Sequence, residues 1–452
     1  MRTTGFRSMV LYILLAAFLG GLGYLLVNFV FNGSKWAMQP YNSHINSENS
    51  TVKLGDITDR DGNVLATTEN GTRSYRGDES VRRALLHTVG DPYGYISTSV
   101  QSTMSAKLSG YNIFTGLNDT IFNRMGSNIT LTVNQSACAA AYNALGGKNG
   151  AVLVYNYKTG EILCKVSAPT FDPENVPEDL ETNDAYKGAY LDNTLSASFT
   201  PGSIFKIVTA AAAMERWPDS WETMTYDCQG AVELAGSNVT CFHGNAHGTQ
   251  DMAAALGNSC NVYFAQLANE LGADALQAKA EEMGFNTQFS FEGISIAKST
   301  IDVSGTNANE LGWAGVGQHT VLANPYHMMV LMGAIANGGE YVQPKLAQGG
   351  NLLGGGGGDR QLVSSTEASQ LKNLLRNDVA NYYGDYLFPE GMNVCAKTGT
   401  GEVGDEKGPN CWMVGFCDSA EYPYAFSVLV EDGIGGIESA GSVASAVLSA
   451  LA

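Results

Sequence analysis

Three short motifs of polar and reactive residues constrain this chain more than any other feature. They occur in the order Ser203-Ile204-Phe205-Lys206, Ser259-Cys260-Asn261 and Lys397-Thr398-Gly399-Thr400. Together they supply a hydroxyl nucleophile, amines and a carboxamide, which are groups that nucleophilic catalysis uses. The first serine precedes the second by 56 residues, and the lysine of the third motif follows 138 residues later.

Each motif alone carries little information, because its pattern recurs in this chain. Average residue usage predicts about one or two Ser-x-x-Lys patterns by chance. The second Lys-Thr-Gly, at 158–160, lies between two apolar runs and predicts a structural hairpin turn. The other Ser-x-x-Lys patterns are Ser50/Lys53, Ser295/Lys298 and Ser369/Lys372. The surrounding sequence must therefore identify the functional copies.

The sequence around Ser203 predicts a buried helix that begins beside the serine. Thr200-Pro201-Gly202 ends the preceding segment, and an apolar run continues to Met214. Ser203 and Lys206 are three residues apart and share one helical face. Apolar neighbours disfavour an ammonium ion, so we expect a lowered lysine pKa and a neutral amine that can accept the serine proton. The alternative is a serine that only caps a helix, with a lysine that reaches water.

The motif Ser259-Cys260-Asn261 lies between two segments that both look helical, 251–256 and 262–268. It therefore predicts a short turn that joins two helices. A hydroxyl in such a turn can relay protons, and a carboxamide can hold a substrate carbonyl. The alternative is a plain polar connection.

The third motif follows the segment 392–396 and precedes a second predicted strand, 411–416. This arrangement favours an edge strand, in which Gly399 lets a substrate backbone approach closely. The lysine and the two threonines of the motif offer positive charge and hydroxyl groups to a carboxylate.

The motif set and its spacings resemble the serine penicillin-recognising enzymes, and the sequence around each motif is similar to class B penicillin-binding proteins. The resemblance covers most of the chain beyond the first 32 residues and is weakest over residues 70 to 130. It rests on 200–206, 257–264, 396–402, Gly317-Gln318 with Asn324-Pro325, 336–339 and the segment 55–66.

The resemblance implies a role for each matched residue. Ser203 would be the acylated nucleophile and Lys206 its general base, and Thr400 would help to bind the terminal carboxylate of the substrate. The backbone N–H groups of Ser203 and Thr400 would form the oxyanion hole. The implied catalytic set is Ser203, Lys206, Ser259, Asn261 and Lys397, and the implied substrate-binding set is Thr398, Gly399 and Thr400.

The implied activity is that of a peptidoglycan D,D-transpeptidase. The serine attacks the D-Ala-D-Ala carbonyl of a stem peptide, D-Ala leaves, and an amine of a neighbouring stem resolves the acyl-enzyme. β-Lactam antibiotics would inhibit it covalently. The resemblance also implies a glycosyltransferase of the SEDS family (shape, elongation, division and sporulation) as partner, and this chemistry needs no metal or organic cofactor.

Three alternatives stay open. A β-lactamase or β-lactam sensor shares the acylation apparatus, but a class A hydrolase needs a glutamate, and Glu281 is a poor candidate. A non-catalytic cell-wall scaffold is disfavoured because the expected polar residues are intact. A carboxypeptidase that releases D-Ala to water uses the same residues.

Charge and cysteine content limit the remaining possibilities. The net charge of −19 argues against nucleic acid as a partner, because its phosphates would be repelled. Cys228 and Cys241 flank a polar loop, for which a disulfide and two unpaired thiols are equal alternatives. A zinc site of Cys228, Cys241, His247 and Asp251 is a third hypothesis. Buried thiols are predicted at Cys138, Cys164, Cys260, Cys395, Cys411 and Cys417.

The N-terminal apolar run predicts a membrane anchor. Residues 9–31 carry no charge, and about 20 apolar residues span a bilayer. Arg2 and Arg7 precede the run, which favours a cytoplasmic N-terminus and an extracytoplasmic catalytic domain. A cleaved signal peptide is the alternative, but its apolar region would typically be about 7–15 residues long.

The expected fold class is α/β (α+β), with a central antiparallel sheet flanked by helices in the catalytic domain. We expect a cytoplasmic tail at 1–8, a transmembrane anchor at 9–31, a pedestal or dimerisation-like module at 32–148, and a transpeptidase domain at 149–452. A five-glycine run at 354–358 predicts a surface loop.

Overall fold

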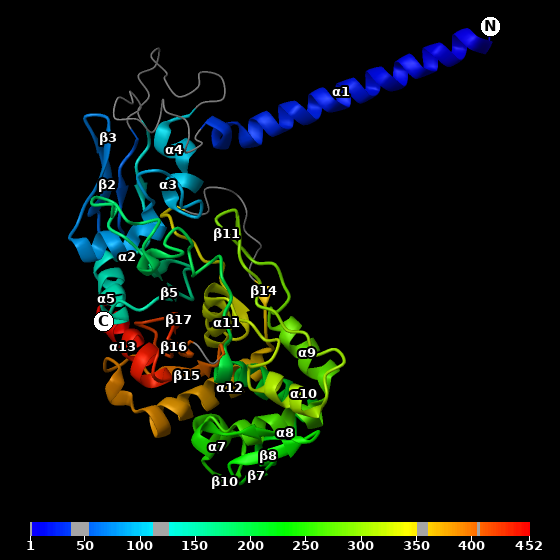
Figure 1. Ribbon diagram of the computed structural model, residues 1–452, viewed down its shortest axis with the longest axis vertical. Coiled ribbons are helices and arrows are strands. Elements are labelled where there is room, and N and C mark those ends of the chain that lie inside the picture. The colour runs from blue at the N-terminus through cyan, green and yellow to red at the C-terminus, as the bar shows by residue number, and fades with distance from the viewer. Residues whose placement is uncertain (1, 38–53, 112–125, 350–359, 405–406) are drawn as a thin grey trace.

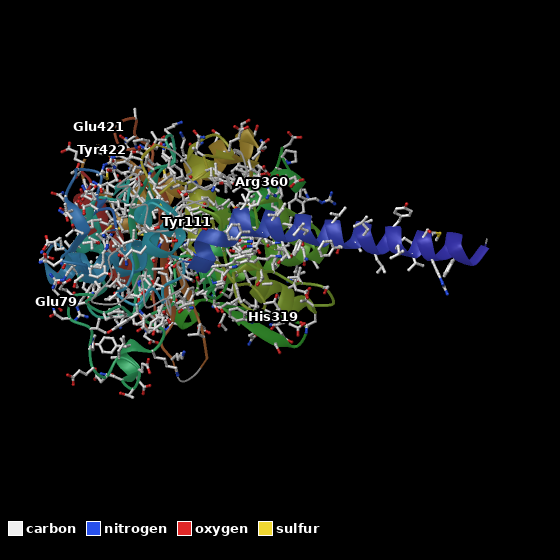
Figure 2. The ribbon with its side chains drawn as sticks, turned by 90° about the horizontal axis from the view of Figure 1, so that it is seen from above. Glu79, Tyr111, His319, Arg360, Glu421 and Tyr422 are labelled. Atoms are coloured by element: carbon white, nitrogen blue, oxygen red, sulfur yellow. The ribbon has the colours of Figure 1, made fainter. Side chains whose placement is uncertain are left out.

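The computed structural model describes residues 2–37, 54–111, 126–349, 360–404 and 407–452. The predicted glycine loop at 354–358 lies outside these ranges. Helix α1, Arg2–Ala37, carries exposed apolar side chains over most of its length, and they point outwards without neighbours when the molecule is seen from above (Figure 2). Its apolar segment Gly5–Gly33 has 29 residues, which is long enough to cross a membrane. A long helix with an exposed apolar segment fits a membrane-anchored protein.

A small mixed module follows helix α1 (Figure 1). Its sheet has the order β3-β2-β1-β4, with β1 parallel to β4 and the other pairs antiparallel. Asn70 and Gly71, both with positive φ, form the tight turn between β2 and β3. The strands are β1 Ile57–Thr58, β2 Val64–Glu69, β3 Thr72–Tyr75 and β4 Ile129–Thr130, and the helices are α2 Glu79–Val89, α3 Val100–Thr103, α4 Ser105–Ser109 and α5 Gln135–Leu145.

The second sheet is five-stranded and wholly antiparallel, with the order β15-β16-β17-β5-β6. Strands from the two ends of the catalytic region therefore pair, and β15 is left at one edge. The hairpin predicted at Lys158 joins β5 to β6. The strands are β5 Gly150–Asn156, β6 Ile162–Ala168, β15 Val394–Gly401, β16 Asn410–Cys417 and β17 Tyr424–Val430.

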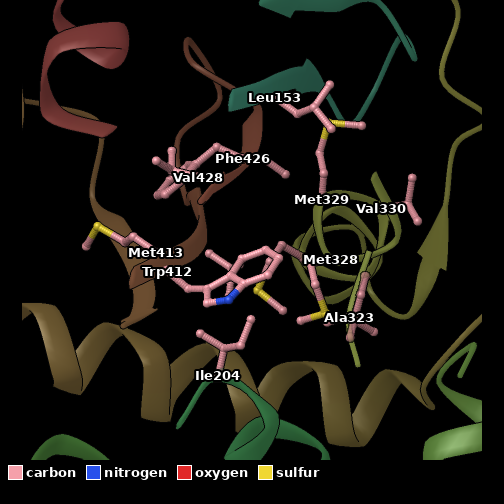
Figure 3. Packing of buried hydrophobic residues seen from close by; sticks show 14 of the residues in the cluster. Leu153, Ile204, Ala323, Met328, Met329, Val330, Trp412, Met413, Phe426 and Val428 are labelled. Atoms are coloured by element: carbon pink, nitrogen blue, oxygen red, sulfur yellow. The ribbon is translucent and has the colours of Figure 1, made fainter. Parts of the chain in front are cut away.

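Helices cover both faces of this sheet, as the sequence predicts. Helix α11, Pro325–Ala336, is buried along almost its whole length, which suits a helix that is apolar on all sides. It packs against Trp412 and Phe426 through Met328 and Met329 (Figure 3). The π-helical segment η7, Gly436–Gly441, α13, Ser442–Ser449, and α5 lie on the opposite side (Figure 1).

A largely helical lobe packs below the sheet and the edge strand β15 (Figure 1). Its helices are α6 Lys206–Arg216, α7 Met252–Gly257, α8 Asn261–Leu271, α9 Ala273–Glu282, α10 Ala308–Gly315 and α12 Ser365–Asp378. Short turns of helix are η1 Asp184–Tyr186, η2 Gly202–Phe205, η3 Trp221–Thr223, η4 Phe242–Gly244, η5 Val379–Tyr383 and η6 Asp385–Leu387. Short strand pairs are β7 Tyr226–Cys228 with β10 Gly248–Gln250, β8 Ala231–Leu234 with β9 Ser237–Thr240, β11 Ser290–Phe291 with β12 Ile294–Ser295, and β13 Glu340–Tyr341 with β14 Arg360–Gln361.

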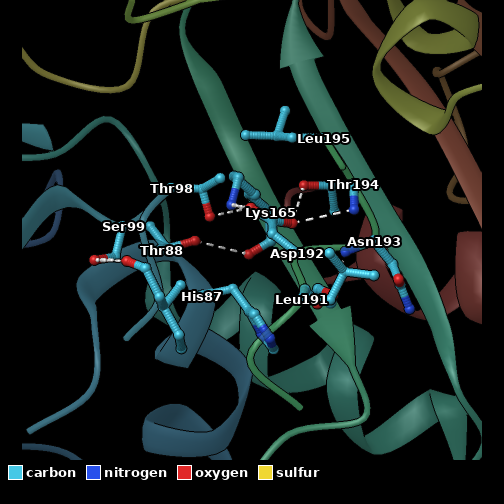
Figure 4. A network of polar contacts seen from close by, with 12 residues as sticks. His87, Thr88, Thr98, Ser99, Lys165, Leu191, Asp192, Asn193, Thr194 and Leu195 are labelled. Carbon is cyan, nitrogen blue, oxygen red and sulfur yellow. Dashed lines mark hydrogen bonds and ion pairs between the residues drawn. The ribbon is translucent and has the colours of Figure 1, made fainter. Parts of the chain in front are cut away.

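A buried polar network ties the N-terminal module to the sheet (Figure 4). Lys165 of β6 forms an ion pair of 2.6 Å with Asp192, and both side chains are buried. Thr88 of α2 donates a hydrogen bond to the carbonyl of Lys165. His87, also buried, bonds to the carbonyl of Ala189 through Nε2. The two parts of the chain therefore share both polar contacts and a continuous hydrophobic core.

Candidate active site

The residues around Ser203 form a tight 3₁₀ turn, η2, which continues directly into α6. Gly202 has a φ of +55°, and a Cβ there would lie 2.3 Å from the carbonyl oxygen of Thr400. Only glycine therefore allows the turn to rest on strand β15. The indole of Trp412 in β16 donates a hydrogen bond of 2.9 Å to the carbonyl of Thr200, which holds the chain just before the turn. Ser203 is thereby placed, half-buried, beside the edge strand.

Lys206 is fully buried, and its Nζ atom contacts the first two motifs at once. It lies 3.0 Å from Ser203 Oγ, 2.8 Å from Asn261 Oδ1, and 2.6 Å and 3.3 Å from the carbonyl oxygen and Oγ of Ser259. The carbonyl and carboxamide oxygens can only accept hydrogen bonds, whereas the Ser203 hydroxyl can also donate one. A neutral amine can donate to those two acceptors and turn its lone pair toward Ser203.

The surroundings of Lys206 favour that neutral form. Burial lowers the pKa of Lys206 well below its ordinary range, and the positive charge of Lys397 lowers it further. No carboxylate forms a salt bridge with Lys206 in the part of the chain that the structure describes. Desolvation is therefore the main cause of the shift, as the apolar sequence predicted.

The second motif forms the predicted turn between two helices, α7 and α8. Ser259 adopts a positive φ of 53°, which reverses the chain within a single residue. Its Oγ atom lies between two amines, 3.3 Å from Lys206 Nζ and 3.2 Å from Lys397 Nζ. The Nδ2 atom of Asn261 donates to the carbonyl of Thr240 at 2.8 Å, and this bond turns Oδ1 toward Lys206. One hydroxyl group thus connects the two lysines of the site.

The third motif lies on β15, which is an edge strand as predicted. Lys397 is fully buried, whereas Thr398 and Thr400 are partly exposed. The structure gives a second reason for a glycine at residue 399. A Cβ there would lie 2.5 Å from the carbonyl oxygen of Pro201, so the glycine is required by the close approach of the η2 turn. Any contact with a substrate at this residue must use its backbone atoms.

Two functional candidates were missed by the sequence analysis because they lie in no motif. Tyr383 lies in η5, a π-helical turn after α12, and π-helical turns are frequent at functional sites. Its Oη atom lies 3.1 Å from Lys397 Nζ, and it accepts hydrogen bonds from the backbone N–H of Thr398 at 3.3 Å and from its hydroxyl at 3.2 Å. Tyr383 therefore holds the lysine and the first threonine of the third motif together.

Asp378, at the end of α12, is the second residue that was missed. It is fully buried, and neither carboxylate oxygen has a hydrogen-bond partner among the described residues. Burial raises the pKa of Asp378 to about 7, although the positive charges of Lys397 and Lys206 oppose this shift. A buried carboxyl group with a raised pKa therefore lies near the two lysines of the site.

The other copies of the motifs lie elsewhere. Ser295 and Lys298 are exposed near β12, and Ser369 is exposed on α12. Glu281 is also exposed, and its side chain accepts hydrogen bonds from the neighbouring residues Gln277 and Asn286. The Ser50 copy lies outside the described residues.

The expectations for the cysteines are partly corrected. The Sγ atoms of Cys228 and Cys241 are 3.6 Å apart and not covalently bonded, so of the two equal alternatives the structure has the free thiols and not the disulfide. Asp251 caps α7 by accepting from the backbone N–H of Ala254 and does not join the cysteines. Cys260, rather than Asp251, lies beside Cys228, Cys241 and His247. The six cysteines that were predicted to be buried thiols are all buried.

Comparison with known proteins adds an independent observation. Residues 150–451 match the family model described as the penicillin binding protein transpeptidase domain, and this range contains all three motifs. The chain is 27% identical over 381 residues to the peptidoglycan D,D-transpeptidase PbpA of Mycolicibacterium smegmatis, covering 75% of each chain. It is 29% identical over 354 residues to PbpA of Mycobacterium tuberculosis, covering 71% of this chain and 70% of the relative.

Solved structures show the same architecture. Penicillin-binding protein A from M. tuberculosis, as a ceftriaxone acyl-enzyme complex, has a TM-score of 0.77 at 26% identity, covering 88% of this chain and 98% of that one. The D,D-transpeptidase domain of a peptidoglycan glycosyltransferase from Eggerthella lenta has a TM-score of 0.74 at 28% identity, with coverage of 88% and 98%.

Proposed function

The chain belongs to the penicillin-binding protein transpeptidase family, and we propose that Ser203 is the nucleophile through which it cross-links peptidoglycan. The chain is a peptidoglycan D,D-transpeptidase, as its relatives are. The observation that carries the assignment of Ser203 is its contact of 3.0 Å with the buried amine of Lys206.

The first step is acylation. Neutral Lys206 takes the proton of Ser203 as Oγ attacks the carbonyl between the two D-Ala residues of a stem peptide. The proton then passes to the amine of the leaving D-Ala, and the Ser259 hydroxyl, which lies between both lysines, supports a relay role. An amine from a neighbouring stem attacks the resulting ester, the same groups take its proton, and Ser203 is released with a new peptide bond formed.

The edge strand β15 is the proposed peptide-binding element. An edge strand has unpaired backbone N–H and C=O groups that an extended peptide can bind. We assign the carboxylate of the substrate to Thr400, with Thr398 and the Gly399 backbone alongside, and the charge of Lys397 nearby. The N–H groups of Ser203 and Thr400 would stabilise the oxyanion, since both lie where η2 rests on β15.

The same groups would react with β-lactams. Relatives of known structure were solved as acyl-enzymes with ceftriaxone, imipenem and penicillin G. In this chain the acyl group would be carried by Ser203. Acyl transfer by this route requires no organic cofactor.

We also propose a topology and a partner. Helix α1 would anchor the chain with residues 1–8 in the cytoplasm and the catalytic domain, 149–452, outside, because Arg2 and Arg7 precede the uncharged run 9–31. Residues 32–148 would act as a pedestal between membrane and catalytic domain. A SEDS-family glycosyltransferase is the membrane partner that the family resemblance leads us to propose.

The assignment of Ser203 can be tested by covalent labelling. The full chain, purified in detergent, is incubated with a fluorescent penicillin beside the variants Ser203→Ala and Ser295→Ala. Ser295 is a matched control, because it also begins a Ser-x-x-Lys pattern but is exposed elsewhere. We expect a persistent label on the wild type and on Ser295→Ala and none on Ser203→Ala. Label on Ser203→Ala would refute the assignment, and rapid loss of label from the wild type would indicate a β-lactamase.

A second experiment separates transpeptidation from carboxypeptidase activity. Purified enzyme is given lipid-linked or polymeric glycan with pentapeptide stems, and the digested products are analysed by mass spectrometry. Cross-linked dimers are the expected main product. Tetrapeptide monomers alone would show that water, rather than an amine, resolves the acyl-enzyme.

A further inference from the structure

We propose that one divalent metal ion of the zinc type binds beside the active site, between the side chains of Cys228, Cys241, His247 and Cys260. Each of these side chains offers one ligand atom, and all four ligand atoms lie within 4.8 Å of one another. The proposed ion would be structural and would hold the second motif in place.

Three contacts between the ligand atoms have the distances of a zinc tetrahedron. Cys241 Sγ lies 3.6 Å from Cys228 Sγ and 3.7 Å from Cys260 Sγ, and Cys228 Sγ lies 3.4 Å from Nδ1 of His247. With Zn–S near 2.3 Å and Zn–N near 2.0–2.1 Å, tetrahedral geometry separates two sulfurs by about 3.8 Å, and a sulfur from a nitrogen by about 3.5 Å. A disulfide would need an S–S distance of about 2.05 Å and would leave the third sulfur and the imidazole unused.

Four separate segments deliver these ligands. Strands β7 and β10 pair so that Cys228 lies opposite Gly248, which puts His247 beside it, and the N–H of His247 donates to the carbonyl of Cys228. Cys241 follows β9. Cys260 is the N-cap of α8. The convergence of ligands from distant segments makes this a defined site rather than a local pair of cysteines.

The chemistry of the ligands selects the class of ion. Three thiolates with one imidazole form a Cys₃His set, which is a closed structural zinc set. Soft sulfur ligands disfavour Mg²⁺ and Ca²⁺, which prefer oxygen. The three cysteines are buried and His247 is partly exposed, so the imidazole lies on the side open to solvent. Binding would release the thiol protons, and affinity for the ion should therefore rise with pH.

The site is connected to the catalytic groups through Cys260. This residue lies between Ser259 and Asn261, whose carbonyl and carboxamide oxygens contact Lys206 Nζ. Asn261 also donates to the carbonyl of Thr240, the residue before Cys241. An ion that joins Cys241 to Cys260 would therefore stabilise both ends of this hydrogen bond. This consequence rests on the proposed function, whereas the metal site itself does not.

The test begins with the metal content of the full chain, purified in detergent without chelators. Elemental analysis should find close to one zinc per chain, and the variants Cys228→Ser and His247→Ala should lose it. Cys164→Ser is the matched control, because Cys164 is a buried free thiol in β6, and it should keep the zinc. Thermal unfolding of each variant checks that it is folded.

A spectroscopic measurement covers the case in which a variant folds poorly. The wild type is depleted of metal under reducing conditions and loaded with Co²⁺. We expect the ligand-field bands of tetrahedral, thiolate-bound cobalt, which zinc should displace. The proposal is overturned if reduced wild type takes up neither zinc nor cobalt, if mass spectrometry shows a Cys228–Cys241 disulfide in the native chain, or if His247→Ala and Cys228→Ser both keep the metal.

The link to catalysis is tested separately. Removing the metal should slow acylation by fluorescent penicillin about ten-fold, the lower end of the effect of a group that orients others, and adding zinc should restore the rate. An unchanged rate would refute the link but leave the metal site standing. If the wild type holds its zinc but is not labelled by fluorescent penicillin at all, the result would instead count against Ser203 as the nucleophile.

Discussion

The Nζ atom of Lys206 lies 3.0 Å from the Oγ atom of Ser203, and its closest other partners can only accept hydrogen bonds. The two residues therefore have the geometry of a base and the group that it deprotonates. Their environment also favours the neutral amine, because burial lowers the lysine pKa.

This pair predicts how acylation depends on pH. The neutral fraction of Lys206 increases as pH rises through its lowered pKa, so the rate of penicillin acylation should rise with pH and then level off below the range of an ordinary lysine. Arginine cannot lose its proton in this range. Lys206→Arg should therefore be slower by about 10²–10⁴ where the wild-type rate has levelled off, and its rate should not rise with pH in the same range. Single-turnover labelling of the full chain from about pH 5 to 9 measures both effects, and equal pH profiles for wild type and variant would contradict the assignment of the base.

Tyr383→Phe should weaken catalysis without unfolding the chain. The substitution removes the hydroxyl that contacts Lys397 Nζ and both the N–H and hydroxyl of Thr398. Hydrogen bonds to charged groups contribute about 1.5–3 kcal/mol, so we expect the acylation rate to fall roughly ten- to a hundred-fold. Tyr382→Phe is the control, since this neighbouring tyrosine is partly exposed. A similar loss in both variants would assign the effect to the η5 turn as a whole.

Asp378→Asn should change how stability depends on pH. The pKa of Asp378 is raised from 3.8 to about 7, so the folded state favours the protonated carboxyl. The stability that this group contributes is fully present below about pH 4 and is lost as pH rises through about 7. Asparagine cannot ionise, so the variant should match the wild type near pH 4 and exceed it at pH 8, by at most about 4 kcal/mol.

Unfolding temperatures of the full chain at several pH values check this prediction. Asp385→Asn is a control of opposite sign, because its hydrogen bond to Arg376 lowers the pKa of this exposed aspartate. Any small stability that Asp385 contributes is lost as pH falls. A constant difference between Asp378→Asn and wild type across the range would contradict the role of protonation.

Lys165→Met should destabilise the fold. The variant leaves Asp192 buried without its partner, and breaking a buried ion pair in this way costs about 3–5 kcal/mol. The additional change Asp192→Asn should recover part of the loss, because it removes the unpaired charge. Lys158→Met on the exposed β5–β6 turn is the control and should have little effect. Denaturant unfolding measures the free energy of unfolding of the wild type, the two single variants and the double variant. An equal loss of stability in Lys165→Met with and without Asp192→Asn would show that the two residues are not coupled.

Much of the site could be predicted because its parts are local in sequence. Proline and glycine before Ser203, and the apolar run after it, place the serine in the turn that leads into α6. The helices on both sides of Ser259 predict a turn, and the short strand before Lys397 predicts β15. These features depend on periodicity and backbone preferences of neighbouring residues, which a sequence states directly.

The sequence by itself determined which chemical groups are available and in which local structures they lie. Tertiary structure alone decided that Tyr383 and Asp378 join the site, that Gly399 makes room for the η2 turn, and that Cys260 rather than Asp251 lies beside Cys228. Each of these outcomes depends on contacts between segments that are distant in the chain, and such burial and packing leave no local signal in the order of the residues.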